Sequence, residues 1–155
     1  DTSLAKVGDT VTVTFTASET LSGTPTVAIG GQTASVTNTT GNQYEATYTL
    51  TANDTAGAQA INIQFSDAGG NTRTATATTD SSSVSLDKTA PNLSSVSIAS
   101  SNANHSSVAT VGDTVTVTFT ASETLSGTPT VKIGGQTASV TNTSGNQYEA
   151  TYTLT

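Results

Sequence analysis

The chain has 155 residues, no cysteine, and eleven acidic against four basic side chains, for a formal net charge of −7 at pH 7. The absence of cysteine excludes disulfide bonds, zinc–thiolate clusters and a thiol nucleophile. The acidic balance argues against a nucleic-acid partner, which needs clustered Lys and Arg, and no apolar run is long enough for membrane insertion as a helix.

The sequence repeats itself with a period of 104 residues. Residues 7–51 match residues 111–155 at 43 of 45 positions. The differences are Ala28 against Lys132 and Thr40 against Ser144. Since one period has the length of an ordinary domain, the pattern predicts tandem repeats.

Apolar and polar residues alternate in several short segments, which is typical of half-buried antiparallel strands. In TVTVTFT, for example, Val11, Val13 and Phe15 alternate with threonines. In chain order the predicted strands are residues 10–16, 60–65, 71–79, 93–99, 114–121, 129–133, 136–140 and 146–154. The Gly-Gly pair at 134–135 predicts a hairpin turn. We therefore predict an all-β fold, namely an immunoglobulin-like antiparallel β-sandwich with about seven strands per repeat.

The polar segment from about residue 80 to 91 is the predicted linker, because it is rich in serine and ends in Pro91. Residues 1–86 are then a repeat that lacks its first strand, and residues 87–155 are the start of the next repeat, without its last two strands. Because partial sandwiches expose apolar faces and unpaired strand edges, we expect neighbouring sequence or neighbouring molecules to complete both.

The sandwich topology predicts that acidic loops gather at the two ends of each repeat. One end is expected to collect Glu19, Glu123, Asp67, Asn71 and Asp87, and the other Asp9, Asp113, Asn53 and Asp54. Such oxygen ligands favour calcium over zinc or copper. Calcium could lie where repeats join, held by Asp87 and Glu123 with Asp9 or Asp54 of the preceding repeat, or at Glu19, Asp67 and Asn71. The alternative is hydrated loop acids that keep a threonine-rich surface soluble.

Three segments, LDKTAPNLSSVSIAS, VGDTVTVTFTASE and FSDAGGNTRTATAT, resemble the bacterial immunoglobulin-like repeats of giant surface adhesins. The period and the near-identity of the copies resemble the extender repeats of RTX adhesins, closest to the 104-residue repeats of an ice-binding member. The resemblance implies a calcium-rigidified spacer on the bacterial cell surface, secreted by a type I system. Its partners would be identical neighbouring repeats and terminal adhesion domains elsewhere in the protein. By position, the resemblance assigns calcium-linked acids to Asp87, Glu19, Glu123 and Asp67.

Catalysis is not expected. His105 is the only histidine, and its counterpart one period earlier is Asp1, so the copies share no histidine that could act as a general base. No nucleophile elbow, P-loop or zinc motif occurs. The alternative function is a ligand-binding module for a glycan, a receptor or ice. Against it, the alternation points most aromatic side chains inward, and a twisted sheet spoils a flat threonine array.

Overall fold

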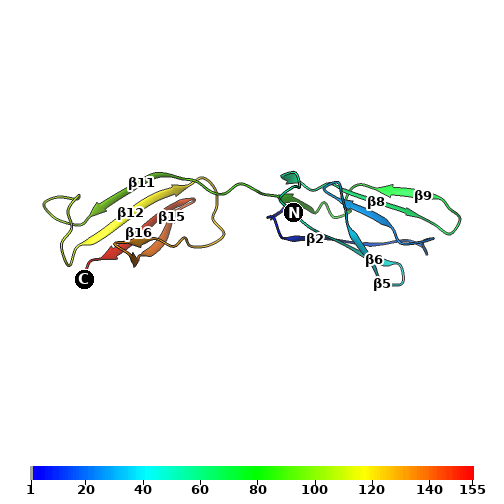
Figure 1. Cartoon of the computed structure of the whole chain (residues 1–155), viewed down its shortest axis with the longest axis horizontal. Coiled ribbons are helices and arrows are strands. Elements are labelled where there is room, and N and C mark those ends of the chain that lie inside the picture. Colours follow the sequence, from blue (N-terminus) through cyan, green and yellow to red (C-terminus); the bar gives the residue numbers. More distant parts are fainter. Residues whose placement is uncertain (1) are drawn as a thin grey trace. The chain divides into compact units, whose positions relative to one another are not determined.

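A computed structural model describes residues 2–155, and every regular element within them is a β-strand. The chain divides into two compact units, Asp1–Lys88 and Thr89–Thr155, which can be followed by colour in Figure 1. Within the described residues there is no helix of the length and apolar character needed to cross a membrane. The predicted all-β class is confirmed.

The first unit contains two main antiparallel sheets, with strand orders β2-β6-β5 and β4-β3-β8-β9, and a small sheet of order β1-β10-β7. Figure 1 shows β8 and β9 as a layer over β2, β6 and β5. The strands are β1 (Thr2–Ala5), β2 (Thr10–Thr16), β3 (Thr26–Ile29), β4 (Gln32–Thr33), β5 (Ser35–Thr40), β6 (Gln43–Thr49), β7 (Gly57–Ala58), β8 (Ile61–Ser66), β9 (Thr72–Ala75) and β10 (Ser83–Leu86).

Both main sheets of the first unit send apolar side chains into one core. Val11 and Ala46 come from the first sheet, and Val27, Ile29 and Ile63 come from the second. Val27, Ile29 and Ala46 are 0% exposed. Two sheets that share a core in this way pack as in a β-sandwich.

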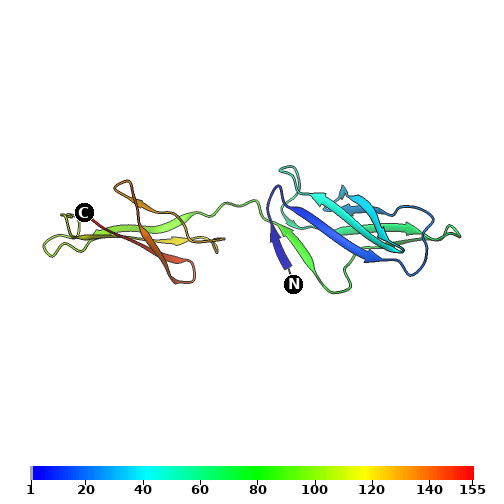
Figure 2. The ribbon, with the colours of Figure 1, turned by 90° about the horizontal axis from the view of Figure 1, so that it is seen from below.

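The strand β10 lies inside the segment predicted to be a linker. It pairs in parallel with β1 and antiparallel with β7, and Figure 2 shows it in green beside the dark blue β1. Its Leu86 is 1% exposed and belongs to the core. Within β10, Val84 and Leu86 alternate with Ser83 and Ser85, so one short strand lies in an otherwise polar segment. The compact unit accordingly extends to Lys88 and includes Asp87, past the boundary predicted after residue 86.

The second unit has a four-stranded sheet of order β11-β12-β16-β15 and a separate hairpin, β13-β14. The strands are β11 (Leu93–Ser100), β12 (Thr114–Ala121), β13 (Lys132–Ile133), β14 (Gln136–Thr137), β15 (Ser139–Ser144) and β16 (Gln147–Thr153). The predicted turn joins β13 to β14, with φ of 59° at Gly134 and 84° at Gly135. Positive φ at both central residues is typical of a type I′ hairpin, which glycine adopts without strain.

The two copies of the repeated segment fold alike where their neighbours are the same. β2 pairs with β6 in the register in which β12 pairs with β16. Phe15 therefore stacks on Tyr44, and Phe119 stacks on Tyr148. In both pairs the ring centroids are 5.4 Å apart and the interplanar angle is 14°. The near-identity in sequence thus extends to strand register and side-chain packing.

Candidate functional site

Hydrogen bonds bring three of the predicted calcium ligands to one end of the first unit. Leu50 N donates to Asp9 O (2.9 Å), which joins the turn before β2 to the loop after β6. Asp87 N donates to Ala5 O (2.8 Å), so the end of β10 reaches the same turn. Asp9, Asp54 and Asp87 therefore lie at this end. We call it the Asp54 end, and it comprises residues 5–9, 50–55 and 86–88.

Asp54 is a buried carboxylate, 3% exposed. The Tyr48 hydroxyl donates to both of its oxygens at 3.0 Å. Its Oδ2 also accepts from Thr51 N at 2.6 Å and from Thr51 Oγ1 at 3.1 Å. The backbone N–H of Thr51 is the main cause that lowers the pKa of Asp54 below its usual value of 3.8. Burial and the bond to Asp54 raise the pKa of Tyr48. These donors hold the carboxylate in place, so Asp54 stabilises the conformation of the loop after β6.

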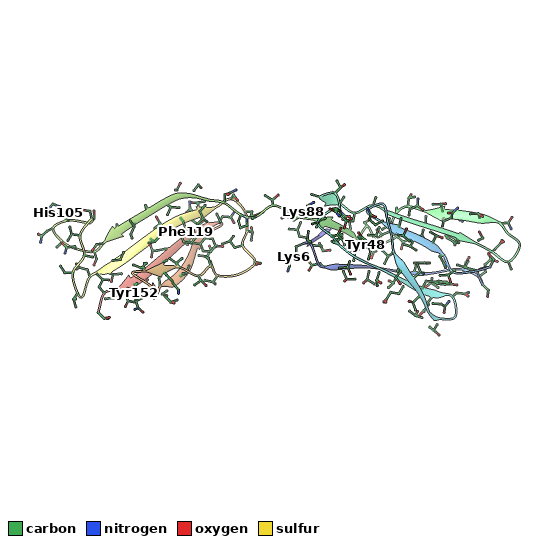
Figure 3. All side chains as sticks on the ribbon, viewed as in Figure 1. Lys6, Tyr48, Lys88, His105, Phe119 and Tyr152 are labelled. Carbon is green, nitrogen blue, oxygen red and sulfur yellow. The ribbon has the colours of Figure 1, made fainter. Side chains whose placement is uncertain are left out.

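Two of the four basic side chains also lie at the Asp54 end. Lys88 Nζ donates to the carbonyl oxygens of Ala52 (2.8 Å) and Asp54 (3.0 Å). Lys6 Nζ lies 3.9 Å from Asp9 Oδ1. Figure 3 shows Lys6, Tyr48 and Lys88 gathered at this end. Carbonyl oxygens are also hard ligands for metal ions. The loop therefore presents oxygen atoms that converge on a cation, and an ammonium group lies there.

Asp67 and Asn71 lie in the loop that joins β8 to β9, and they are hydrogen-bonded to each other. Asn71 Nδ2 donates to Asp67 Oδ2 at 2.7 Å, and Asn71 N donates to Oδ1 at 2.8 Å. The side-chain bond and then the backbone bond from Asn71 lower the pKa of Asp67. Leu21 bridges to Asp67, so the loop that carries Glu19 is adjacent. Glu19 itself is exposed. The structure thus joins Asp67 to Asn71 and places the Glu19 loop beside them.

In the second unit, Asp113 is held by the turn that precedes β12. Its Oδ2 accepts from Thr110 N (2.8 Å), from Thr110 Oγ1 (3.0 Å) and from Asn102 Nδ2 (2.9 Å). The Thr110 backbone N–H, followed by the Asn102 amide, lowers the pKa of Asp113. Glu123 is half-buried in the loop after β12. Asp87, its expected partner, belongs to the first unit.

One local turn, which the sequence analysis missed, recurs at three of these acids. The first residue donates its N–H to the Asp Oδ2 three positions on, and the Asp N–H donates back to the first residue's carbonyl. The pairs are Lys6–Asp9, Thr51–Asp54 and Thr110–Asp113. A Thr-x-x-Asp spacing beside a strand is the signal that could have revealed two of them. No local spacing signals the bonds from Tyr48, Lys88 and Asn102.

Among residues 2–155, no three histidine, aspartate or glutamate side chains lie close enough together to hold a metal ion. The acids are instead divided between loops, and Asp9, Asp54, Asp67 and Asp113 each accept hydrogen bonds within their own loop. A cation at either end would therefore need backbone carbonyls, water or a neighbouring unit to complete its coordination.

Comparisons with protein-family models, with curated proteins and with solved structures found no significant match. A function for this chain is therefore inferred from its repeated sequence and from the loops described above.

Proposed function

We propose that the chain is part of a tandem array of immunoglobulin-like repeats that serves as a non-catalytic extender of a bacterial surface adhesin. The observation that carries the proposal is the repetition itself. Residues 7–51 and 111–155 match at 43 of 45 positions and pair in the same register. An array of near-identical units has near-identical ends, so each unit can join its neighbours in the same way.

The strand order supports the immunoglobulin-like part of the proposal. In the second unit, the sheet β11-β12-β16-β15 has the order first, second, fifth and fourth strand when β13 and β14 count as one position. The A-B-E-D sheet of a constant-type immunoglobulin domain has the same strand order. In the first unit, β3, β8 and β9 have the order of the opposite C-F-G sheet. Taken together, the two units contain all seven strand positions of this pattern.

Calcium is part of the proposal because the donors at the ends of the units are hard oxygen atoms. At the Asp54 end, Asp9, Asp54 or Asp87 would contribute carboxylates, and a bound ion would compete with Lys88 for the carbonyls of the loop. At the other end Glu19, Asp67 and Asn71 would contribute. Asp113 and Glu123 are the second-copy counterparts of Asp9 and Glu19. A bound ion would neutralise these acids and restrict motion between units.

The extender role is tested with arrays in which the 104-residue period is repeated one to four times ahead of the chain. Small-angle scattering in calcium should give a maximum dimension that grows by a constant increment per added period. A chelator should broaden the distribution of dimensions. Arrays that collapse in calcium, without a constant increment, would contradict the extender role. A glycan array that is positive for a single period would favour the ligand-binding alternative.

The calcium sites are tested by a matched pair of substitutions, Glu19→Gln in the end loop and Glu45→Gln in the middle of β6. Extracellular calcium modules bind with a Kd of about 0.1–1 mM, so a tenfold excess of ion stabilises a unit by about 1.4 kcal/mol per site. We expect Glu19→Gln to reduce the calcium-dependent rise in Tm and Glu45→Gln to retain it. If Tm is the same with and without calcium in the parent chain, the metal part of the proposal fails and the spacer part stands.

A further inference from the structure

Lys88 is the last residue of the compact first unit, and its side chain reaches back to the loop after β6. Its Nζ donates to the carbonyl oxygen of Ala52 at 2.8 Å and to that of Asp54 at 3.0 Å. The two acceptors lie 36 and 34 positions earlier in the chain. These contacts are therefore tertiary, and they join the residue after β10 to a separate segment of the same unit.

The loop presents both carbonyl groups because its own turn is already closed. Thr51 N donates to Asp54 Oδ2 at 2.6 Å, and Asp54 N donates back to the Thr51 carbonyl at 3.2 Å. Residues 51–55 belong to no strand, so their carbonyl oxygens need a donor from elsewhere. One ammonium group, that of Lys88, serves the carbonyls of Ala52 and Asp54 together.

The carboxylate of Asp54 gives this contact a second, electrostatic reason. It is 3% exposed, and the groups that donate to it, on Tyr48 and Thr51, are neutral. A buried charge is costly unless an opposite charge lies nearby. The Thr51 N–H is the main cause of the lowered pKa of Asp54, and the positive charge of Lys88 lowers it further. Lys88 therefore compensates the charge of the loop that it contacts.

Lys6, the other lysine at the Asp54 end, makes a weaker kind of contact. Figure 3 shows both lysines at this end. Lys6 Nζ lies 3.9 Å from Asp9 Oδ1, which is beyond hydrogen-bond distance, and the Lys6 side chain is 77% exposed. An exposed ion pair of this kind contributes little to stability, whereas hydrogen bonds from a charged donor are among the stronger ones. The two lysines carry the same charge at the same end of the unit and differ in their contacts.

We propose that Lys88 is an internal counter-ion that anchors the end of the first unit to the loop after β6 without a metal ion. The backbone beside it supports this role, since Asp87 N donates to Ala5 O at 2.8 Å. The chain is thus held by β1 through its backbone and by the loop through the Lys88 side chain. Loss of the positive charge at residue 88 would release the second contact. The proposal is independent of calcium and of the extender role.

The first test compares the lysines of the parent chain in a chelator. An acetylating reagent attacks the neutral amine, so an ammonium group held by two carbonyls should react slowly, and mass spectrometry of digested chain measures the rate at each lysine. We expect Lys88 to react at least about threefold more slowly than Lys6 and Lys132, which are also exposed. In urea the three lysines should react at the same rate.

The second test compares Lys88→Gln with Lys6→Gln, which remove the same charge from the same end. Lys88→Gln should speed hydrogen exchange at the amides of Asp54 and Asp87 at least about fivefold, because the loop and the end of β10 open locally. Lys6→Gln should leave both amides unchanged. Lys88→Arg keeps the charge and should restore protection. Exchange at Val27, which is 0% exposed in the core, should be the same in all variants.

The proposal is overturned if Lys88 reacts as fast as Lys6 in the folded chain, or if the two glutamine variants affect Asp54 and Asp87 equally. It is also overturned if Lys88→Gln speeds exchange at Val27 as much as at Asp54, because Lys88 would then support the whole unit and not its end. If Lys88 becomes protected only after calcium is added, a metal ion holds this end and the proposal is wrong.

Discussion

The carboxylate of Asp54 fixes the loop between β6 and β7, and its state of protonation should control the acid stability of the first unit. Its pKa is lowered from 3.8 in the folded chain, so folding favours the charged form. The stability that this group contributes is complete above its unfolded pKa and is lost as the pH falls through the folded value. Asp67 and Asp113 also have lowered pKa values. We therefore expect Tm to vary little between about pH 7 and pH 5 and to fall steeply below about pH 4.

The variant Asp54→Asn tests whether this carboxylate is responsible. An amide cannot accept all the bonds from Tyr48 and Thr51 as a charged group does. At pH 7 the variant should lower the Tm of the first unit by at least about 4 °C, and its transition should respond less to acid. The control is Asn53→Ala, at the exposed neighbouring position, which should change Tm little. Equal acid profiles for Asp54→Asn and the parent chain would contradict this role for Asp54.

The location of these acids could be predicted from the sequence better than their contacts. The antiparallel topology of a sandwich sets the direction of each strand, and hence which loops share an end, so Asp67 and the Glu19 loop could be expected together. The bonds of Asp54 depend on the far end of β6, where Tyr48 lies, and on Lys88, which follows β10. Such contacts are made by the tertiary fold, and no local spacing encodes them.

Among the strands, those with strict alternation were predicted to within a residue or two, because one buried face is enough to define them. β12 matches its predicted range, residues 114–121. The range 71–79 was too long, since alternating Thr and Ala continues beyond β9 while pairing with β8 ends at Ala75. The range 129–133 was too long because β13 has no neighbour like β8. β10 was missed although Val84 and Leu86 alternate with serines, because the serine-rich composition and Pro91 favoured a linker; its pairing with β1 and β7 shows the strand.

The contribution of β10 can be measured by a matched pair of leucine substitutions in paired strands. Leu86 in β10 is 1% exposed, and Leu4 in the neighbouring β1 is 75% exposed. Leu86→Ala should lower the free energy of unfolding of the first unit by about 2–5 kcal/mol, because it leaves a cavity in a closed core. Leu4→Ala should change it by less than about 0.5 kcal/mol. Urea unfolding measures both, and a small effect of Leu86→Ala would mean that the segment before Lys88 is a linker after all.

The two units share most of their sequence over the repeated segment but differ in how their cores are closed. The first has one cluster of buried residues, to which both main sheets and β10 contribute. The second has two smaller clusters, one around Val115 and Ala150 and one around Phe119 and Tyr148. Less apolar surface is removed from water when no second sheet covers the first. The second unit should therefore be the less stable of the two.

We expect calorimetry of the chain to show two transitions, of which the one at lower temperature is the unfolding of the second unit. Phe15 and Phe119 provide the assignment, because each stacks on a tyrosine with the same geometry. Phe119→Leu should lower only the first transition, and Phe15→Leu only the second. A single transition that both substitutions shift equally would show instead that the two units unfold as one body.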